Sequence, residues 1–348
     1  MDAHDQSAST DHTASAEQPF ASLTPSALLD AIDSLGLRTD GRLHALNSFE
    51  NRVYQVGIEA DDGSTAPMLI AKFYRPGRWS DAAIREEHRF THQLADAEIQ
   101  VAAPLAFGDE TLHHVGDFRF ALYPRLRGRP PELSDLDALT WMGRFIGRIH
   151  AVGARSTFRE RPALSLTRFG DEPLQWLNTQ DLVPPELREA WRITAERALQ
   201  VARLRFADAG ELRTLRIHGD CHAGNILWAD DGPWFVDFDD CCSGPAVQDL
   251  WLLLSGEREA MSLQLGAVLR GYRQFHDFDL RELGLIEALR TLRLIHYAAW
   301  IGRRWHDPAF PIAFPWFGSA RYWQDRILEL KEQIAAMEEE PLQPADPA

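Results

Sequence analysis

The sequence predicts an α+β fold in two lobes: a small N-terminal lobe with a sheet and one helix, and a larger, mostly helical C-terminal lobe with one hairpin. Two observations predict it. Up to residue 123, short apolar segments rich in β-branched and aromatic residues are separated by turn residues, as in strands. After a Gly-, Pro- and Arg-rich connector, apolar residues recur mostly at helical spacing. The length of 348 residues is sufficient for both lobes.

The N-terminal lobe is expected at 22–123, after an acidic tail at 1–21 whose Ser-, Thr- and Ala-rich composition predicts disorder. Helices are predicted at 22–37 and from an N-cap at Ser80 to about residue 95. The predicted strands are 42–46, 53–58, 68–73, 105–107, a short one around 115, and 118–123. An Asp-Asp-Gly-Ser turn at 61–64 predicts a hairpin between the second and third of them.

The C-terminal lobe is expected at 132–340, between a hinge at 124–131 and a short tail at 341–348. Its predicted helices are 133–152, 184–209, 248–255, 261–275, 280–305 and 323–337. One strand pair, 226–228 and 234–238, interrupts them and is joined by an Asp-Asp-Gly turn. This hairpin matters because the polar residues with the strongest chemical pattern flank it.

The charge of the chain limits its partners. The formal net charge is −16, from 36 basic and 52 acidic residues, which argues against nucleic-acid and anionic-membrane partners. No run of 18 or more apolar residues is present. The N-terminus lacks the basic and apolar regions of a signal peptide, so we expect a cytoplasmic protein. We also expect a monomer. Three cysteines, an odd number, do not predict a disulfide framework, and their redox activity stays open.

The segment at 217–240 carries the chemistry; it begins IHGDCHAGNILW and ends WFVDFDD. Phosphoryl transfer from ATP needs a carboxylate that orients the attacking hydroxyl and accepts its proton, and oxygen ligands that hold Mg²⁺ on the phosphates. Asp220 supplies the carboxylate, Asn225 follows five residues later, and the hairpin returns Asp237 beside Asn225. Asp220 and Asp237 are therefore the predicted catalytic residues, and Asn225 and Asp237 the predicted Mg²⁺ ligands.

Lys72 is the predicted cation for the phosphates of ATP. Only Lys72 and Lys331 are lysines among the 36 basic residues, and Lys72 lies inside an apolar strand segment. A compact ammonium at such a place suits phosphate, where a forked guanidinium would be bulky. The structural alternative is a strand lysine whose charged end reaches solvent.

These residues carry a family resemblance. His218–Asp220 with Asn225 and Asp237 resembles the catalytic loop and metal-binding aspartate of aminoglycoside phosphotransferases and choline kinases, a branch of the two-lobed protein-kinase-like fold. The chain resembles more closely still the stress response kinase A (RdoA) family of atypical bacterial Ser/Thr protein kinases. The stretches that carry this second resemblance are LNSFENRVYQ at 46–55, KFYRP at 72–76, HGDCHAGNILW at 218–228, GPAVQDLW at 244–251 and WHDPAFP at 305–311.

The resemblance implies roles around the nucleotide. Ser48, in a turn without glycine, would contact ATP, although a plain polar turn is the alternative. Lys72 would pair with a Glu of the following helix; the register favours Glu87, with Glu86 left open. Backbone groups at 123–126 would hold the adenine.

The resemblance also implies that Asp249 braces the catalytic loop. Asp249 follows Asp237 by twelve residues, too few for the activation segment of typical protein kinases. Asp239 and Asp240 could help to hold a second Mg²⁺ or could form a solvated acidic turn. The expected partners are therefore ATP, Mg²⁺ and a protein substrate.

The resemblance implies an Mg²⁺-dependent serine/threonine protein kinase that autophosphorylates and acts in bacterial stress response. Two alternatives are open: a kinase of small hydroxyl compounds resembling choline, homoserine or an aminoglycoside, and a pseudokinase that binds ATP and signals by docking. The aromatic residues between Trp300 and Trp323 are expected mainly in packing, with a wall of the substrate cleft as the functional alternative. His88 and His92, one helical turn apart, are expected on a solvated helix face.

Overall fold

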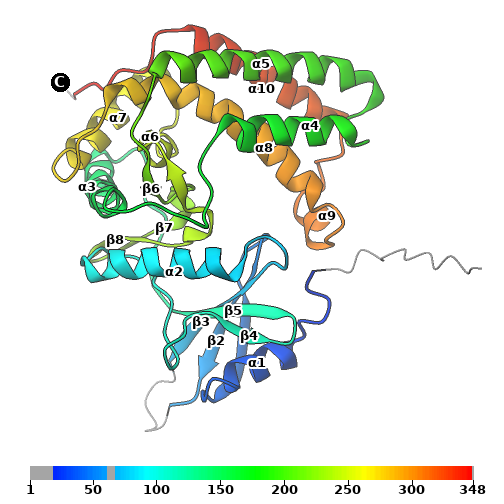
Figure 1. Cartoon of the computed structure of the whole chain (residues 1–348), viewed down its shortest axis with the longest axis vertical. Helices are drawn as coiled ribbons and strands as arrows, with labels where there is room; N and C mark the ends of the chain where they lie inside the picture. The colour runs from blue at the N-terminus through cyan, green and yellow to red at the C-terminus, as the bar shows by residue number, and fades with distance from the viewer. Residues whose placement is uncertain (1–18, 61–66, 347–348) are drawn as a thin grey trace, which may run out of the picture.

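The computed structural model describes residues 19–60 and 67–346. The turn predicted at 61–64 and most of the predicted N-terminal tail lie outside these residues. Figure 1 shows two lobes, with the N-terminal sheet in one and most of the helices in the other. The α+β fold class predicted from the sequence is confirmed.

The N-terminal lobe is a five-stranded antiparallel sheet with the strand order β1-β2-β3-β5-β4. Its elements are α1 (Pro25–Asp33), β1 (Thr39–Ala45), β2 (Arg52–Ile58), β3 (Met68–Tyr74), α2 (Asp81–Asp96), β4 (His113–Val115) and β5 (Phe118–Pro124). The Ser80 hydroxyl accepts a hydrogen bond from the Ala83 N–H, so Ser80 is the N-cap of α2 as predicted.

The C-terminal lobe is mostly helical. Its α-helices are α3 (Leu136–Gly153), α4 (Glu172–Thr179), α5 (Arg188–Ala209), α6 (Val247–Trp251), α7 (Arg258–Tyr272), α8 (Ile286–Arg303), α9 (Ala309–Ala313) and α10 (Ala320–Glu338). Its strands are β6 (Leu215–Ile217), β7 (Ile226–Ala229), β8 (Gly232–Phe235) and β9 (Cys242–Gly244). Short π or 3₁₀ turns are η1 (Thr167–Asp171), η2 (Pro185–Leu187), η3 (Ala223–Asn225), η4 (Phe238–Asp240) and η5 (Leu280–Leu285).

Several predicted elements differ from the structure. The segment at 105–107 is not a strand; Phe107 makes only an isolated bridge with Glu110. The helix predicted at 22–37 is shorter, because Pro25 follows the N-cap Thr24 and a turn with Gly36 at φ 83° follows its end. The sequence prediction missed α4, α9 and the β6–β9 pair, which are too short for a periodic pattern.

Helix α2 joins the two lobes, and it lies between the sheet and the β7–β8 hairpin in Figure 1. Its buried Phe90 and Leu94 belong to the same apolar core as Phe235 and Phe238 of the hairpin region. Val101, after α2, pairs in parallel with Phe235. The β7–β8 hairpin is therefore packed against α2, whose Ile84 shares an apolar cluster with Tyr74 of β3.

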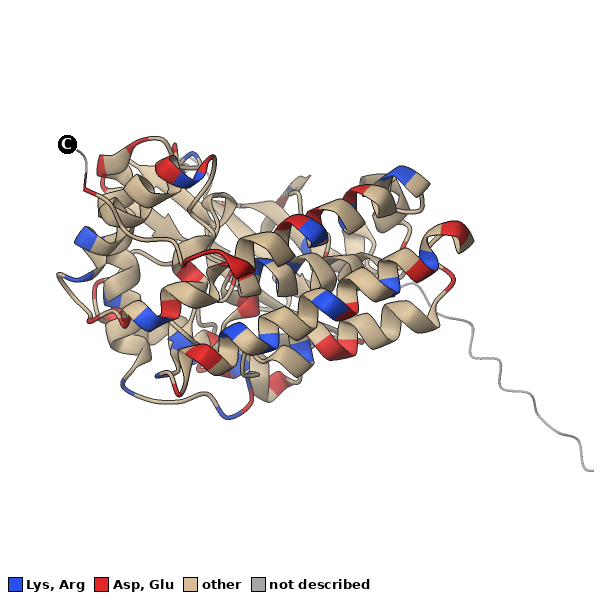
Figure 2. Ribbon diagram, turned by 90° about the horizontal axis from the view of Figure 1, so that it is seen from above, with Lys and Arg blue, Asp and Glu red and all other residues tan. Residues whose placement is uncertain are grey.

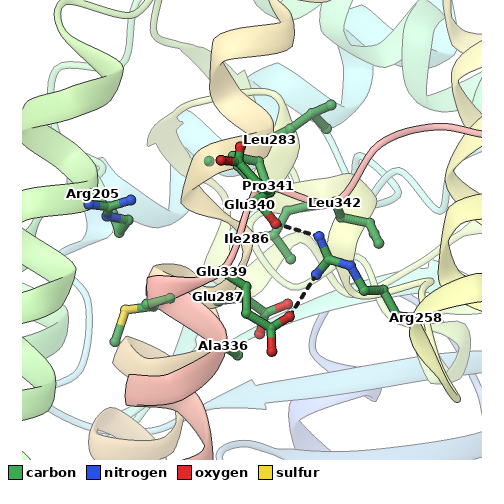
Figure 3. Close-up of a pocket in the computed structure, with 12 residues that line it drawn as sticks. Arg205, Arg258, Leu283, Ile286, Glu287, Ala336, Glu339, Glu340, Pro341 and Leu342 are labelled. Carbon is green, nitrogen blue, oxygen red and sulfur yellow. Dashed lines mark hydrogen bonds and ion pairs between the residues drawn. The ribbon is translucent and has the colours of Figure 1, made fainter.

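The segment after α10 packs back on the C-terminal lobe as far as residue 346. Arg258 contacts Glu339 and the carbonyl of Glu340 beside a cavity of about 20 Å³ (Figure 3), room for about one water molecule. Leu342 is buried, and the N–H of Ala345 donates to the carbonyl of Ser262. No helix of the described residues is long and apolar enough to cross a membrane.

Candidate active site

A cleft of about 1100 Å³ lies between the lobes. The N-terminal lobe contributes the turn between β1 and β2, strand β3 and the segment 123–126. The C-terminal lobe contributes residues around 219–227 and 236–242, and one face of α8. Every site residue predicted from the sequence, Ser48, Lys72, Glu87, Asp220, Asn225 and Asp237, lines this cleft.

The loop after β6 is held by Asp249 of α6. The N–H groups of His218 and Gly219 donate to its carboxylate at 2.7 and 2.8 Å, and His150 contacts it at 2.9 Å. Gly219 has φ 86°, and a Cβ there would lie 2.2 Å from the Asp240 carbonyl oxygen, so only glycine fits. These bonds hold the backbone of the loop immediately before Asp220.

Asp220 lines the cleft and is partly buried. Its carboxylate pairs with the Arg293 guanidinium at 2.6 Å and lies 3.5 Å from His222 Nε2. Burial by itself would raise the pKa of Asp220, but the His222 hydrogen bond and the Arg293 charge outweigh it, so this pKa is lowered. The carboxylate is therefore ionised and able to accept a hydrogen bond from a hydroxyl.

Asn225 and Asp237 face the same space because the β7–β8 hairpin brings their backbones together. The N–H of Val236 donates to the Asn225 carbonyl at 3.0 Å. The Asn225 Nδ2 donates to the Asp220 carbonyl at 2.9 Å, which leaves its Oδ1 available as a ligand. Asp237 has the left-handed φ of 60°, uncommon for a residue other than glycine, and its half-exposed side chain opens into the cleft.

Lys72 is central to a buried ion cluster. Its Nζ lies 2.8 Å from Asp237, 3.3 Å from Asp239 and 4.0 Å from Glu87. Burial by itself would lower the pKa of Lys72, but the charges of Asp237, Asp239 and Glu87 raise it. Lys72 therefore stays charged, and its end does not reach solvent as the structural alternative supposed.

Glu87 faces Lys72, and Glu86 does not. The Glu86 carboxylate instead accepts the backbone N–H groups of residues 159, 160 and 161, each at 2.8 Å. Glu87 is buried, and burial raises its pKa above the ordinary value. The two adjacent glutamates thus have different tasks, since one faces the ion cluster and the other holds a loop of the C-terminal lobe.

Asp239 is the residue whose importance the sequence prediction missed. It is 3% exposed and contacts Lys72, Arg78 and Asn51, so it does not belong to a solvated acidic turn. Arg161 donates to its main-chain carbonyl. Only the adjacency of three acids at 237–240 hinted at this role. Asp239 therefore joins the turn after β3, the turn before β2 and the catalytic hairpin.

The turn that contains Ser48 is fixed by neighbours on both lobes. The Ser48 hydroxyl donates to the Asn51 carbonyl at 3.0 Å. Glu50 accepts a hydrogen bond from the Trp300 indole and pairs with Arg304 at 2.7 Å, both on the C-terminal lobe. The turn therefore obtains its shape from side-chain contacts, although it lacks the glycines of typical phosphate-covering loops.

The remaining candidates of the sequence analysis are mostly structural. Most of the aromatic residues between Trp300 and Trp323 pack in one core, while Trp300 and Phe314 also line the cleft. The prediction for His88 was wrong: it is buried and contacts the Tyr74 hydroxyl at 2.8 Å. The three thiols are free and buried, and burial raises their pKa, that of Cys241 to about 12. They are therefore protonated at neutral pH.

The residues of the cleft fit a hard divalent cation. The carboxylate of Asp237 and the free amide oxygen of Asn225 are oxygen donors, the kind that Mg²⁺ prefers when phosphates and water complete its shell. Such a site needs no cluster of three His, Cys, Asp or Glu ligands, and the described residues contain none.

Comparison with known proteins agrees with this geometry. The model of the "Phosphotransferase enzyme family" matches residues 42–286. Stress response kinase A of Escherichia coli (strain K12) is 42% identical over 324 residues, 93% of this chain and 96% of that protein. Serine/threonine protein kinase RdoA of Salmonella typhimurium (strain LT2) is 42% identical over 328 residues, with the same two coverages.

Among solved structures, amicoumacin kinase hAmiN in complex with AMP-PNP, Ca²⁺ and Ami has the same fold. Its TM-score is 0.66 at 19% identity, over 88% of this chain and 91% of that one. The chain is thus a phosphotransferase of kinase-like fold, and it belongs to the stress response kinase A family.

Proposed function

We propose that this protein is an ATP- and Mg²⁺-dependent kinase that phosphorylates Ser and Thr hydroxyls of proteins, itself included, and acts in bacterial stress response. The observation that carries the proposal is the convergence of Asp220, Asn225, Asp237 and Lys72 in one cleft. The family relationship supports a kinase, and the name of the Salmonella relative supports a Ser/Thr acceptor.

In this proposal Asp220 accepts the proton of the attacking hydroxyl. As the hydroxyl oxygen bonds to the γ-phosphorus, the bond from that phosphorus to the β–γ bridging oxygen breaks, and ADP leaves. Lys72, positioned by Glu87, neutralises part of the negative charge of the phosphates. The protein as a whole is acidic, so this neutralisation has to come from a cation close to the phosphates. The Ser48 turn covers the phosphates, and the backbone at 123–126 holds the adenine.

Asn225 and Asp237 would hold Mg²⁺. When bound, the ion supplies charge neutralisation on the β- and γ-phosphates. Asp237 accepts a hydrogen bond from Lys72 at 2.8 Å, so the same carboxylate can orient the lysine towards the phosphates.

The test is an acceptor assay with the full chain. Labelled ATP and Mg²⁺ are supplied with Ser- and Thr-containing peptides, or with choline, homoserine or an aminoglycoside. We expect label on Ser or Thr of peptides and of the chain, and none in Asp220→Asn. The matched control is Asp231→Asn, whose carboxylate lies at the far end of the β7–β8 hairpin and contacts Trp234.

Label on a small compound with none on any peptide would replace the proposal by a small-molecule kinase. Nucleotide binding with no transfer to any acceptor would support a pseudokinase. Transfer that persists at the wild-type rate in Asp220→Asn would contradict the role given to that carboxylate.

A further inference from the structure

The half of the cleft beyond Asp220 has a face of arginine side chains. Four residues of α8 line the cleft at helical spacing, and so does the residue that ends the helix: Arg293, His296, Trp300 and Arg303, with Arg304 as the C-cap. Beside them, η1 packs against α8, with Phe169 4.8 Å from His296 between ring centroids, and contributes Arg168. We call this surface, Arg168, Arg293, Arg303 and Arg304, the arginine wall.

Two of these arginines form no ion pair with the described residues. Within residues 19–60 and 67–346, neither Arg168 nor Arg303 forms an ion pair within 4.0 Å. Arg303 donates only to the carbonyl of Glu172, at 3.5 Å. Burial lowers the pKa of Arg303; the charge of Glu172 opposes this change, and the charge of Arg168 adds to it. Elsewhere, along the long helices of the C-terminal lobe, basic and acidic residues are interspersed (Figure 2).

The pKa of His296 is affected by the same positive charges. Burial, followed by the charges of Arg303, Arg304 and Arg293, lowers the pKa of His296 to about 3. Four arginine side chains thus gather at one cleft of a protein with a net charge of −16. Unneutralised cations beside a catalytic carboxylate are a typical arrangement for binding an anion.

The wall also disfavours a cationic acceptor. A quaternary ammonium or aminoglycoside would need carboxylates or an open aromatic face. The carboxylates that line the cleft are Glu50, Glu87, Asp220, Asp237, Asp239 and Asp240, and each pairs with a lysine or arginine of this chain. The ring of Trp300 already has the Arg304 guanidinium 5.4 Å from its centroid.

We propose that the arginine wall binds acidic residues next to the Ser or Thr that is phosphorylated, so that the protein selects acidic segments of its protein substrates. This rests on the proposed protein-kinase function. The cavity extends from the nucleotide half along α8 to Arg303, which gives an extended peptide several contacts beyond the acceptor hydroxyl. Arg293, which pairs with Asp220 at 2.6 Å, lies at the end of the wall beside the acceptor hydroxyl.

The experiment compares three peptides of equal length with one central Ser, flanked by Glu, by Lys or by neutral residues. Their binding to the full chain, saturated with Mg²⁺ and AMP-PNP, is measured by fluorescence anisotropy, and kcat/KM with ATP is measured in parallel. We expect the Glu peptide to bind at least ~10-fold more tightly than the Lys peptide, and more weakly as salt rises.

Arg168→Gln and Arg303→Gln should each weaken binding of the Glu peptide by about 3- to 5-fold and leave the neutral peptide unchanged. The matched control is Arg321→Gln on α10, which removes the same charge from a side chain that is 90% exposed and outside the cleft. It should bind all three peptides as the wild type does, which excludes an effect of net charge.

Equal binding of the three peptides, tighter binding of the Lys peptide, or a preference that survives in Arg168→Gln/Arg303→Gln would overturn the proposal. Binding and transfer separate it from the proposed function. Tight binding of the Glu peptide without phosphorylation would count against the protein-kinase function and leave the anionic preference of the wall supported. Phosphorylation of all three peptides at the same rate and affinity would support the protein-kinase function and count against the anionic preference of the wall.

Discussion

The two halves of the cleft treat charge in opposite ways. In the nucleotide half, Lys72, Glu87 and Asp239 are buried and paired with one another or with Arg78 and Arg161. In the half beyond Asp220, Arg168 and Arg303 are exposed and have no ion pair among the described residues. In the first half the charged side chains neutralise one another before any ligand binds. In the second half positive charge remains that a ligand can neutralise.

In the proposed function, where one half binds ATP and the other a protein acceptor, the difference follows from what each half recognises. A phosphate chain with its metal is the same in every cycle, so donors fixed in advance serve it best and need no reorganisation. Protein segments vary, and exposed arginine side chains can adapt to them at the cost of ordering. Single substitutions in the nucleotide half should therefore change activity or stability strongly. Single substitutions in the arginine wall should each change peptide binding by a smaller amount.

The largest expected effect is at Lys72. Lys72→Met should lower kcat/KM for ATP by roughly 10²- to 10³-fold, because the phosphates lose their fixed cation. Steady-state kinetics with the best acceptor peptide measures it. The chain provides its own control in Lys331→Met, which removes the other lysine, an exposed residue of α10, and should leave the kinetics unchanged. Equal effects of the two substitutions on kcat/KM would contradict the role of Lys72 as the cation that binds the phosphates.

The buried acid Asp239 should matter mainly for stability. Asp239→Asn leaves Lys72, Arg78 and Arg161 around a neutral side chain, so the free energy of unfolding should fall by about 3–5 kcal/mol, as for a broken buried ion pair. Chemical denaturation measures it. Asp240→Asn removes the adjacent acid, which is half-exposed and pairs with Arg78, and should cost less than about 1 kcal/mol. Similar losses of unfolding free energy in the two variants would contradict the stabilising role given to the buried Asp239 carboxylate.

The adjacent glutamates of α2 should separate binding from stability. Glu87→Gln weakens the positioning of Lys72 and should raise the KM for ATP by about 10-fold. Glu86→Gln removes the charge that accepts three N–H groups of the loop 159–161, and should lower the free energy of unfolding by about 1–3 kcal/mol with KM unchanged. A higher KM in Glu86→Gln alone would reverse the assignment.

The smallest effect is a shift in titration at His296. The pKa of His296 is about 3 in the folded protein, below the ordinary value of about 6.5. Between these two pH values the unfolded chain binds a proton at His296 and the folded protein does not, so the free energy of unfolding decreases as the pH falls through this range. Arg303→Gln removes a positive charge and should raise the pKa of His296, measured by NMR of labelled histidine. An unchanged pKa would show that Arg303 does not act on this face of α8.

The sequence predicted much of this architecture because local rules decide it. A helix needs a cap and a period of 3.6, and Ser80 with the apolar positions after it satisfied both. The motif from His218 to Asp237 was readable because the spacing of Asp220 and Asn225 and the length of the hairpin are local quantities. His88 was misassigned because its partners Tyr74 and Thr111 lie on other elements.

By itself, then, the sequence determined the two-lobed α+β class, the family and the residues that meet in the cleft. Tertiary structure decided between Glu87, which the sequence favoured, and Glu86, and it alone decided that Asp239 is buried among three cations and that Arg168 lies near Arg303. The physical reason is that burial and charge pairing depend on which elements pack together. Asp239 and Asp240 are neighbours in the chain, but only one of them is enclosed by both lobes.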